Sequence, residues 1–305
     1  FSSSLTCRWD HRPDHRRILV EGDVTGEDLR LAMPALGNDR PTLASLKASG
    51  QVLSQDGWLQ CDRLSVETDV GAFSMTGVLD GRDLATSAGL GKLLRQTCEI
   101  NGNLDLARLA AILPETLRIK KGTQITSGQA QVSFSSRPRK EAGYDGMQWQ
   151  GKLETSNLTA AQGSRKLVWQ QPIQVNVAAH DGPQGPVIEN LRCTANFLNL
   201  QAAGTRDMLT ATATFDLNRL ADQSAGFVDL GGLKLAGAGT AQLSWERLNE
   251  EHFEAVGEMR ILGFQLSVPN RPAWTEDVVA ASFNATGRAD FKTNNRVDTA
   301  ALRIE

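Results

Sequence analysis

An internal repeat constrains this chain more than any other feature, because a chain built from copies of one unit must use the same set of elements several times. Residues 127–134 (SGQAQVSF) align without a gap with residues 238–245 (AGTAQLSW), at a spacing of 111 residues. The same spacing aligns residues 104–110 (LDLARLA) with residues 215–221 (FDLNRLA). Two copies of one unit therefore occupy most of the chain after its first third.

A partial third copy precedes these two. Residues 64–77 align with residues 191–204 at a spacing of 127 residues, and an insertion in the first copy explains the longer spacing. We therefore divide the chain into residues 1–99, a partial first repeat with a helical insertion near 82–96; residues 100–210, a second repeat; and residues 211–305, a third repeat truncated at its C-terminus. Since both ends fall inside a unit, we expect the chain to be a piece of a longer protein.

Alternating apolar and polar residues run through most of each unit, which predicts half-buried β-strands. Val132 and Phe134 point to one face, and Gln131 between them points to the other. The alternation changes phase at residues 197–198 and again at residues 70–71, where a turn or a bulge would return both arms to one face. We expect a mainly β fold, a repetitive antiparallel meander that forms an elongated, curved and groove-like sheet.

One short α-helix per repeat is expected beside these strands. Apolar residues at positions i, i+3, i+4 and i+7 predict an amphipathic helix that Pro114 ends. The residues in this pattern are Leu106, Leu109, Ala110 and Leu113 in the second repeat; their counterparts in the third are Leu217, Leu220 and Ala221, with Phe227 as a further candidate. A helix seated on the apolar face would fill the groove, whereas a helix at its rim would leave the groove open.

Composition argues against several kinds of partner. Hydrophobic residues make up 40% of the chain and charged residues 22%, as in ordered proteins. The formal charge of -3 argues against nucleic acid as a partner. No stretch approaches the roughly 20 apolar residues of a membrane-spanning helix, so this piece itself is not expected to cross a membrane. The four cysteines form no C-x-x-C pair and are interpreted as mostly buried thiols, although disulfides stay open.

No catalytic motif is present in the sequence. The chain has neither a G-x-S-x-G elbow nor a Walker loop, and residues 89–92 resemble a phosphate loop only superficially. His11 and His15 have a spacing that could hold a metal on a helix, but Pro13 between them disfavours a helix. We therefore expect a protein that is not an enzyme, with no catalytic residues, no metal and no cofactor.

Five segments carry a resemblance to a known family: residues 62–77, 104–110, 151–158, 190–204 and 215–221. In these segments the chain resembles the AsmA-like superfamily of bacterial envelope proteins, which is related in architecture to TamB, and it is most similar to the large AsmA-like proteins of planctomycete-type bacteria. The resemblance implies a periplasmic protein of the cell envelope, anchored in the inner membrane. It also implies lipid transport to the outer membrane, or assistance in outer-membrane assembly, without catalytic residues.

An open apolar groove would accept the acyl chains of a phospholipid or another lipid. The residues expected to line it are Val132, Phe134, Ile173, Val175, Leu191, Cys193, Leu198, Leu200, Leu243, Trp245, Met259 and Ile261. The alternative is a structural scaffold of closed β-units that binds no lipid. Its edge strands would pair with envelope or outer-membrane proteins by β-strand addition.

Overall fold

The computed structural model describes residues 2–12, 15–30, 39–80, 95–141, 144–169, 171–229, 232–249, 252–290 and 294–305. The helix predicted in the insertion near 82–96 and the glycine-rich segment 89–92 fall within residues 81–94, outside the described part of the chain. The side chains of His11 and His15 also lie outside the described ones.

The fold is mainly β, as the alternating pattern predicted. The strands are β1 (Ser2–Arg12), β2 (His15–Arg30), β3 (Thr42–Gln55), β4 (Trp58–Thr68), β5 (Gly71–Asp80), β6 (Thr97–Asp105), β7 (Thr123–Glu141), β8 (Tyr144–Gln162), β9 (Arg165–Val168), β10 (Gln174–Gly182), β11 (Gly185–Ala195), β12 (Leu198–Thr205), β13 (Met208–Asp216), β14 (Lys234–Arg247), β15 (His252–Ser267), β16 (Trp274–Asp290) and β17 (Asn294–Ile304). The described residues also form two short helices, α3 (Leu106–Ile112) and α4 (Leu217–Ser224).

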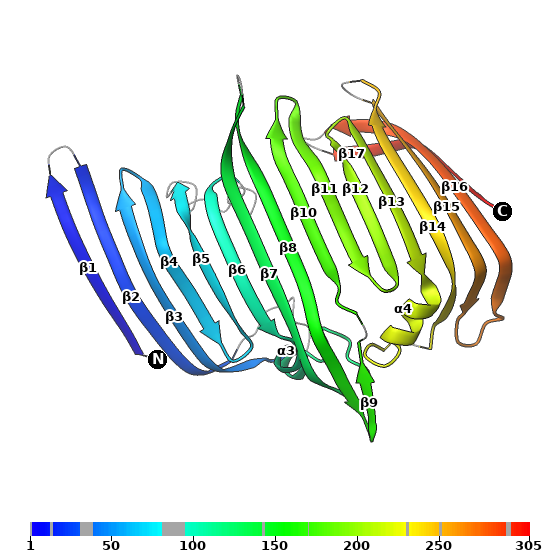
Figure 1. The fold of residues 1–305 in the computed structure, drawn as a ribbon, viewed down its shortest axis with the longest axis horizontal. Helices are drawn as coiled ribbons and strands as arrows, with labels where there is room; N and C mark the ends of the chain where they lie inside the picture. Colours follow the sequence, from blue (N-terminus) through cyan, green and yellow to red (C-terminus); the bar gives the residue numbers. More distant parts are fainter. Residues whose placement is uncertain are drawn as a thin grey trace. The chain divides into compact units, whose positions relative to one another are not determined.

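The chain divides into two compact units, Phe1–Val168 (unit 1) and Trp169–Glu305 (unit 2). Within each unit every strand pairs antiparallel with the next one along the chain, and the strands lie side by side in that order (Figure 1). The sheet does not close on itself. The predicted antiparallel meander is therefore confirmed, and an open sheet is consistent with a groove-like surface.

The 111-residue spacing of the sequence recurs in the elements. β6 ends at Asp105 and β13 ends at Asp216, and in both places a helix begins at the next residue. The strand after the helix begins at Thr123 in unit 1 and at Lys234 in unit 2, again 111 positions apart. The division into three repeats stays a prediction, because the two compact units are defined by packing and meet at Val168 instead.

A two-residue turn explains the change of phase that the two copies share. β11 ends at Ala195 and β12 begins at Leu198, and these two residues pair directly across the turn. Thr68 and Gly71 pair in the same way between β4 and β5. The turn carbonyls are also used alike: Val70 O accepts from Asp105 N at 2.7 Å, and Phe197 O accepts from Asp216 N at 2.9 Å. The predicted turn is thus confirmed in both copies.

An aspartate caps each helix. The carboxylate of Asp105 accepts hydrogen bonds from the backbone N–H groups of Ala107 and Arg108, at 2.9 and 3.0 Å. Asp216 accepts from the N–H of Arg219 at 3.0 Å. Such caps satisfy donors that the first helical turn leaves without partners. Both predicted helices are confirmed, although α4 ends at Ser224 and the buried Phe227 lies beyond it.

The helices lie beside the ends of the strands that they connect (Figure 1). α3 packs against β6 and β7, and α4 packs against β14. Gly128 of β7 makes room for α3, because a Cβ atom there would lie only 3.2 Å from Cβ of Leu106. Among the described residues, the helix of each unit therefore lies at one end of the sheet and does not cover the middle of the strands.

Candidate functional site

One face of unit 2 is apolar across all eight of its strands. Residues paired across antiparallel strands project their side chains to the same face, so the register defines rows of neighbours. One row consists of Val177, Leu191, Ala202, Ala211, Leu243, Gly257, Phe283 and Leu302. The next row consists of Val175, Cys193, Leu200, Ala213, Ala241, Met259, Ala281 and Ile304. Neither row contains a charged or hydrogen-bonding side chain apart from the thiol.

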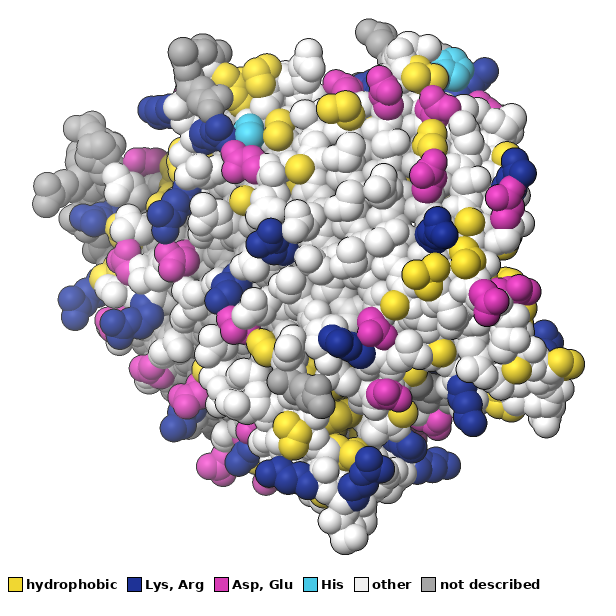
Figure 2. Space-filling model, turned by 45° about the vertical axis from the view of Figure 1, so that its right-hand side comes forward, with side chains coloured by type: hydrophobic (Ala, Val, Ile, Leu, Met, Phe, Trp, Pro, Cys, Tyr) yellow, Lys and Arg dark blue, Asp and Glu magenta, His cyan; other side chains and the backbone are white. Residues whose placement is uncertain are grey.

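The opposite face of unit 2 is polar. The row that lies between the two apolar rows consists of Asn176, Arg192, Gln201, Thr212, Gln242, Glu258, Ser282 and Arg303. Figure 2 shows a face on which charged side chains of both signs are scattered over backbone and uncharged non-hydrophobic side chains, with hydrophobic side chains in small groups between them. The sheet is therefore strongly amphipathic: its polar face can be solvated by water, whereas its apolar face offers water few hydrogen-bond partners.

The apolar face of unit 2 contains a groove of about 430 Å³. Strands β12 to β17 line it and no residue of α4 does. Leu243, Met259 and Phe283 in its wall are 37%, 37% and 38% exposed, and Leu302 at the end of the row is 70% exposed. Contiguous exposed apolar side chains of this size are typical of a binding surface, because isolated domains normally bury them.

On the apolar faces, two glycines leave space for the aromatic rings of neighbouring strands. The ring of Phe283 lies against Gly257 of the neighbouring strand, in the space that a Cβ atom would take. In unit 1 the ring of Phe73 lies over Gly102 in the same manner, with ring atoms 2.6 Å from the place of a Cβ atom. Because the rings lie over glycine instead of standing on the sheet, they cover the backbone without filling the groove.

Unit 1 has an apolar face of the same kind. One row begins at Ser3 of β1 and continues with Val24, Ala48, Val66, Phe73, Gly102, Val132 and Leu153. The next consists of Leu5, Gly22, Gly50, Leu64, Met75, Ile100, Phe134 and Gly151. Phe73 and Leu64 are 41% and 37% exposed in the middle of these rows. The candidate surface therefore occurs once in each unit.

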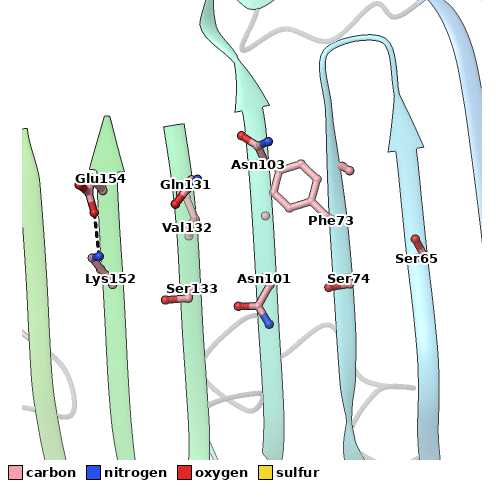
Figure 3. A pocket seen from close by; sticks show the side chains of 12 residues that line it. Ser65, Phe73, Ser74, Asn101, Asn103, Gln131, Val132, Ser133, Lys152 and Glu154 are labelled. Carbon is pink, nitrogen blue, oxygen red and sulfur yellow. Dashed lines mark ion pairs between the residues drawn. The ribbon is translucent and has the colours of Figure 1, made fainter. Parts of the chain in front are cut away.

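A depression of about 490 Å³ lies on the polar face of unit 1. Figure 3 shows Ser65, Ser74, Asn101 and Ser133 in one row of its lining, with Asn103 and Gln131 in the next. Lys152 and Glu154 at its side form an ion pair of 2.7 Å and so neutralise each other. Small hydroxyl and amide groups on a solvated face provide hydrogen bonds but no concentrated charge. The apolar faces are therefore the stronger candidates for binding.

The structure places eleven of the twelve predicted groove residues on these faces. Val132 and Phe134 lie on the apolar face of unit 1. On the apolar face of unit 2 lie Val175, Leu191, Cys193, Leu198, Leu200, Leu243, Trp245, Met259 and Ile261. Ile173 precedes β10 and belongs to no strand. That these residues line a lipid groove stays a prediction.

The predicted lining omitted several residues of the apolar faces, among them the partly exposed Leu64, Phe73, Phe283 and Leu302. Their alternation with polar neighbours was a usable signal, since Phe283 lies between Ser282 and Asn284. What the sequence lacked was the register that brings Phe283 opposite Gly257 and Leu243 in one row.

Two of the four cysteines are buried in the sheet. Burial raises the pKa of the Cys61 and Cys98 thiols, which disfavours the reactive thiolate. Cys193 is half-buried in the apolar face, and Cys7 in β1 is exposed. All four are free thiols. Cys61, Cys98 and Cys193 thus pack as small hydrophobic residues of the sheet.

The described residues contain no group of three or more His, Cys, Asp or Glu side chains that could hold a metal ion. In the same part of the chain, neither helix has the length and apolar character needed to cross a membrane. Comparisons with protein-family models, with curated proteins and with solved structures found no match. The resemblance to AsmA-like proteins therefore stays an interpretation of the sequence pattern.

Proposed function

We propose that this chain is a non-enzymatic scaffold whose apolar sheet faces bind the acyl chains of lipids. The uninterrupted apolar face of unit 2, with its groove of about 430 Å³, carries this proposal. A hydrocarbon chain needs no hydrogen-bond partner, and each buried methylene contributes about 0.8 kcal/mol. An open face with neither charges nor hydrogen-bonding groups in its central rows suits such a ligand and few others.

The position of the helices supports an open groove over a filled one. A helix seated over Val132 or Leu243 would have packed the face into an ordinary closed core. Instead α3 rests on β6 and β7 near Gly128, and α4 contributes nothing to the lining of the groove. Large apolar side chains in the middle of each unit thus retain more than a third of their surface in contact with solvent.

The biological setting of this function rests on the resemblance to AsmA-like proteins. On that basis the chain acts in the periplasm, as part of a protein anchored in the inner membrane. It would transfer phospholipid or another acyl lipid between the inner and outer membranes, or assist outer-membrane assembly. The amphipathic sheet supports this setting in physical terms, because a lipid that crosses an aqueous compartment needs one continuous apolar surface.

A charge placed in the groove tests the proposal. The purified chain is extracted with organic solvent, and the lipids released are quantified by mass spectrometry. Leu243→Asp and Val132→Asp should reduce lipid recovery at least tenfold, because an ionised carboxylate makes the face unfavourable for hydrocarbon. Since Leu243 is 37% exposed, the new carboxylate stays hydrated and circular dichroism should show an intact fold.

The matched controls are Gln242→Asp and Gln131→Asp, which add the same charge to the polar face one residue away. Lipid recovery from these two variants should equal that of the unmodified chain. Equal losses from both faces, or unfolding caused by Leu243→Asp alone, would contradict an open groove. The latter result would favour closed β-units that bind no lipid.

A further inference from the structure

The corner of unit 2 beside α4 contains buried polar atoms that the fold itself does not satisfy. Nε1 of Trp169, Oδ1 of Asn196 and both amide atoms of Gln223 are buried and have no hydrogen-bond partner among the described residues. A buried donor or acceptor left without a partner costs about 1–3 kcal/mol. Three such residues in one place therefore require an explanation.

Trp169 belongs to an aromatic cluster with Phe197 and Phe227, and Asn196 and Gln223 lie one and four residues before these two phenylalanines in the chain. The ring of Trp169 contacts Phe197 and Phe227 edge to face, with ring centroids 6.1 and 5.4 Å apart. Asn196 precedes Phe197 in the turn between β11 and β12, and Nη1 of Arg219 on α4 donates to the carbonyl of Asn196 at 3.3 Å. Gln223 lies one helical turn after Arg219. The unsatisfied atoms thus come from the strand turn, from α4 and from the segment before β10.

The same corner of unit 1 is closed by polar groups that satisfy one another. Asp69, which aligns with Asn196 at the 127-residue spacing, accepts from the backbone N–H of Ala44 at 3.1 Å. Thr116, which aligns with Phe227, donates its backbone N–H to Asp39 at 2.7 Å. Ile112, which aligns with Gln223, has no polar atom to satisfy. The unsatisfied polar atoms are therefore a property of this corner in unit 2 and not of the repeat.

The charged side chain of α4 at this corner, Arg219, already has partners within the protein. Nε of Arg219 lies 3.2 Å from the carboxylate of Asp216, and its Nη1 donates to Asn196 O. The one cation of α4, Arg219, is therefore already engaged by groups of the protein. The available groups are two neutral donors, on Trp169 and Gln223, and two neutral acceptors, on Asn196 and Gln223. They match a ligand group that has both a hydroxyl and a carbonyl.

The corner also adjoins the apolar face. Leu198 follows Phe197 directly, and it pairs with Phe215 in the row that continues to Gly239 and Ile261. A ligand whose polar end lies at Trp169 would therefore extend its apolar end onto the sheet.

We propose that the α4 corner of unit 2 binds the uncharged polar end of an acyl ester such as a monoacylglycerol, whose hydrocarbon chain lies on the apolar face. Gln223 and Trp169 donate to the ester and hydroxyl oxygens, and Asn196 accepts from a hydroxyl group. This inference rests on the proposed function, because it supplies the head-group site for the same acyl ligand.

The test compares three probes on the full chain, each kept below the concentration at which it aggregates. Diphenylhexatriene, which has no polar atom, reports the apolar face by its fluorescence. Displacement of this probe then gives the Kd of 1-monooleoylglycerol and of 1-oleoylglycerol 3-phosphate. The unmodified chain should bind monooleoylglycerol more tightly than its phosphate ester. Gln223→Ile and Trp169→Phe should each raise the Kd of monooleoylglycerol about fivefold to tenfold. Neither variant should change the binding of diphenylhexatriene.

Gln223→Ile introduces the residue that unit 1 has at this position, and Trp169→Phe keeps the aromatic contacts, so both variants should fold. Asp222→Ala, an exposed change on α4, serves as the control and should leave all three affinities unchanged. Unchanged monooleoylglycerol binding in both corner variants would overturn the inference, because it would mean that water satisfies the polar atoms of the corner. The proposed function would still stand in that case. Tighter binding of the phosphate ester would also overturn it. Failure of the unmodified chain to bind diphenylhexatriene would overturn the proposed function itself.

Discussion

At the residue scale, two glycines show how closely the copies share backbone geometry. Gly77 and Gly204 lie 127 positions apart and have φ angles of +154° and +155°. A Cβ atom at either position would collide with backbone of the next strand, at Thr97 O for the first and at Met208 O for the second. Neither strand can move without breaking its ladder, so no side chain is tolerated at these two positions.

Gly77→Ala and Gly204→Ala should therefore each lower the free energy of unfolding by about 1–3 kcal/mol. Urea denaturation followed by circular dichroism measures this change. Gly163→Ala is a suitable comparison, because its Cβ atom would meet nothing within 4 Å and only the positive φ opposes it. It should be the mildest of the three. A neutral effect of Gly204→Ala would contradict the strand register described for β12 and β13.

Asp39 is the residue with the clearest dependence on pH. Its carboxylate accepts from the hydroxyl of Thr116 at 2.6 Å, and this hydrogen bond chiefly holds the pKa of Asp39 below its ordinary value. The folded state thus favours the ionised form. The resulting stability is present above the unfolded pKa of about 3.9 and is lost as the pH falls through the lower folded pKa.

Asp39→Asn should consequently destabilise unit 1 at neutral pH, and the difference from the unmodified chain should shrink as the pH falls below about 4. Thermal melts at a series of pH values measure this difference. A constant difference from pH 7 to pH 3 would show that the charge of Asp39 contributes nothing and that only its shape matters.

At the scale of elements, the aspartate caps allow a direct test of the repeat. Asp105→Ala and Asp216→Ala each remove the acceptor for N–H groups of the first helical turn, at an expected loss of about 1 kcal/mol. Asp222→Ala removes an exposed acidic residue from α4 without touching the cap, and should change stability by less than about 0.5 kcal/mol. Denaturant titrations compare the three variants. Unequal losses at Asp105 and Asp216 would show that the two helices contribute differently to their units.

The helices and strands themselves could be predicted because their signals are local. Leu106, Leu109 and Ala110 have helical spacing in the sequence, and α3 forms there. The phase change at Phe197 predicted a turn, and the hairpin between β11 and β12 has one. Where α4 packs is not local information, since the contact with β14 depends on the register of distant strands.

At the scale of each whole unit, the sequence could indicate which residues share a face but not whether that face is covered. Val132 and Phe134 alternate with polar residues whether a helix covers them or not. Only the placement of α3 and α4 at the strand ends distinguishes an open face from a filled one. The corner at Gln223 was missed for the same reason, because its polar atoms are unsatisfied only in three dimensions.

The central claim is that acyl chains lie on the apolar face of unit 2. Trp245 belongs to this face, since it pairs with Leu209 and Ala255 in the row beside Leu243. Bromine atoms on an acyl chain quench the fluorescence of a tryptophan only when they contact it. A variant that keeps Trp245 as its single tryptophan can therefore report the position of a bound chain.

The most direct measurement titrates this variant with a brominated phospholipid and with its unbrominated form. Its control keeps Trp58, an exposed tryptophan that pairs with Gln55 and Asp80 at the end of a hairpin in unit 1. We predict saturable quenching of Trp245 by the brominated lipid alone, with little quenching of Trp58. Fluorescence of Trp245 that stays unchanged at saturating lipid, or equal quenching of both tryptophans, would contradict the apolar face as the site of the acyl chain.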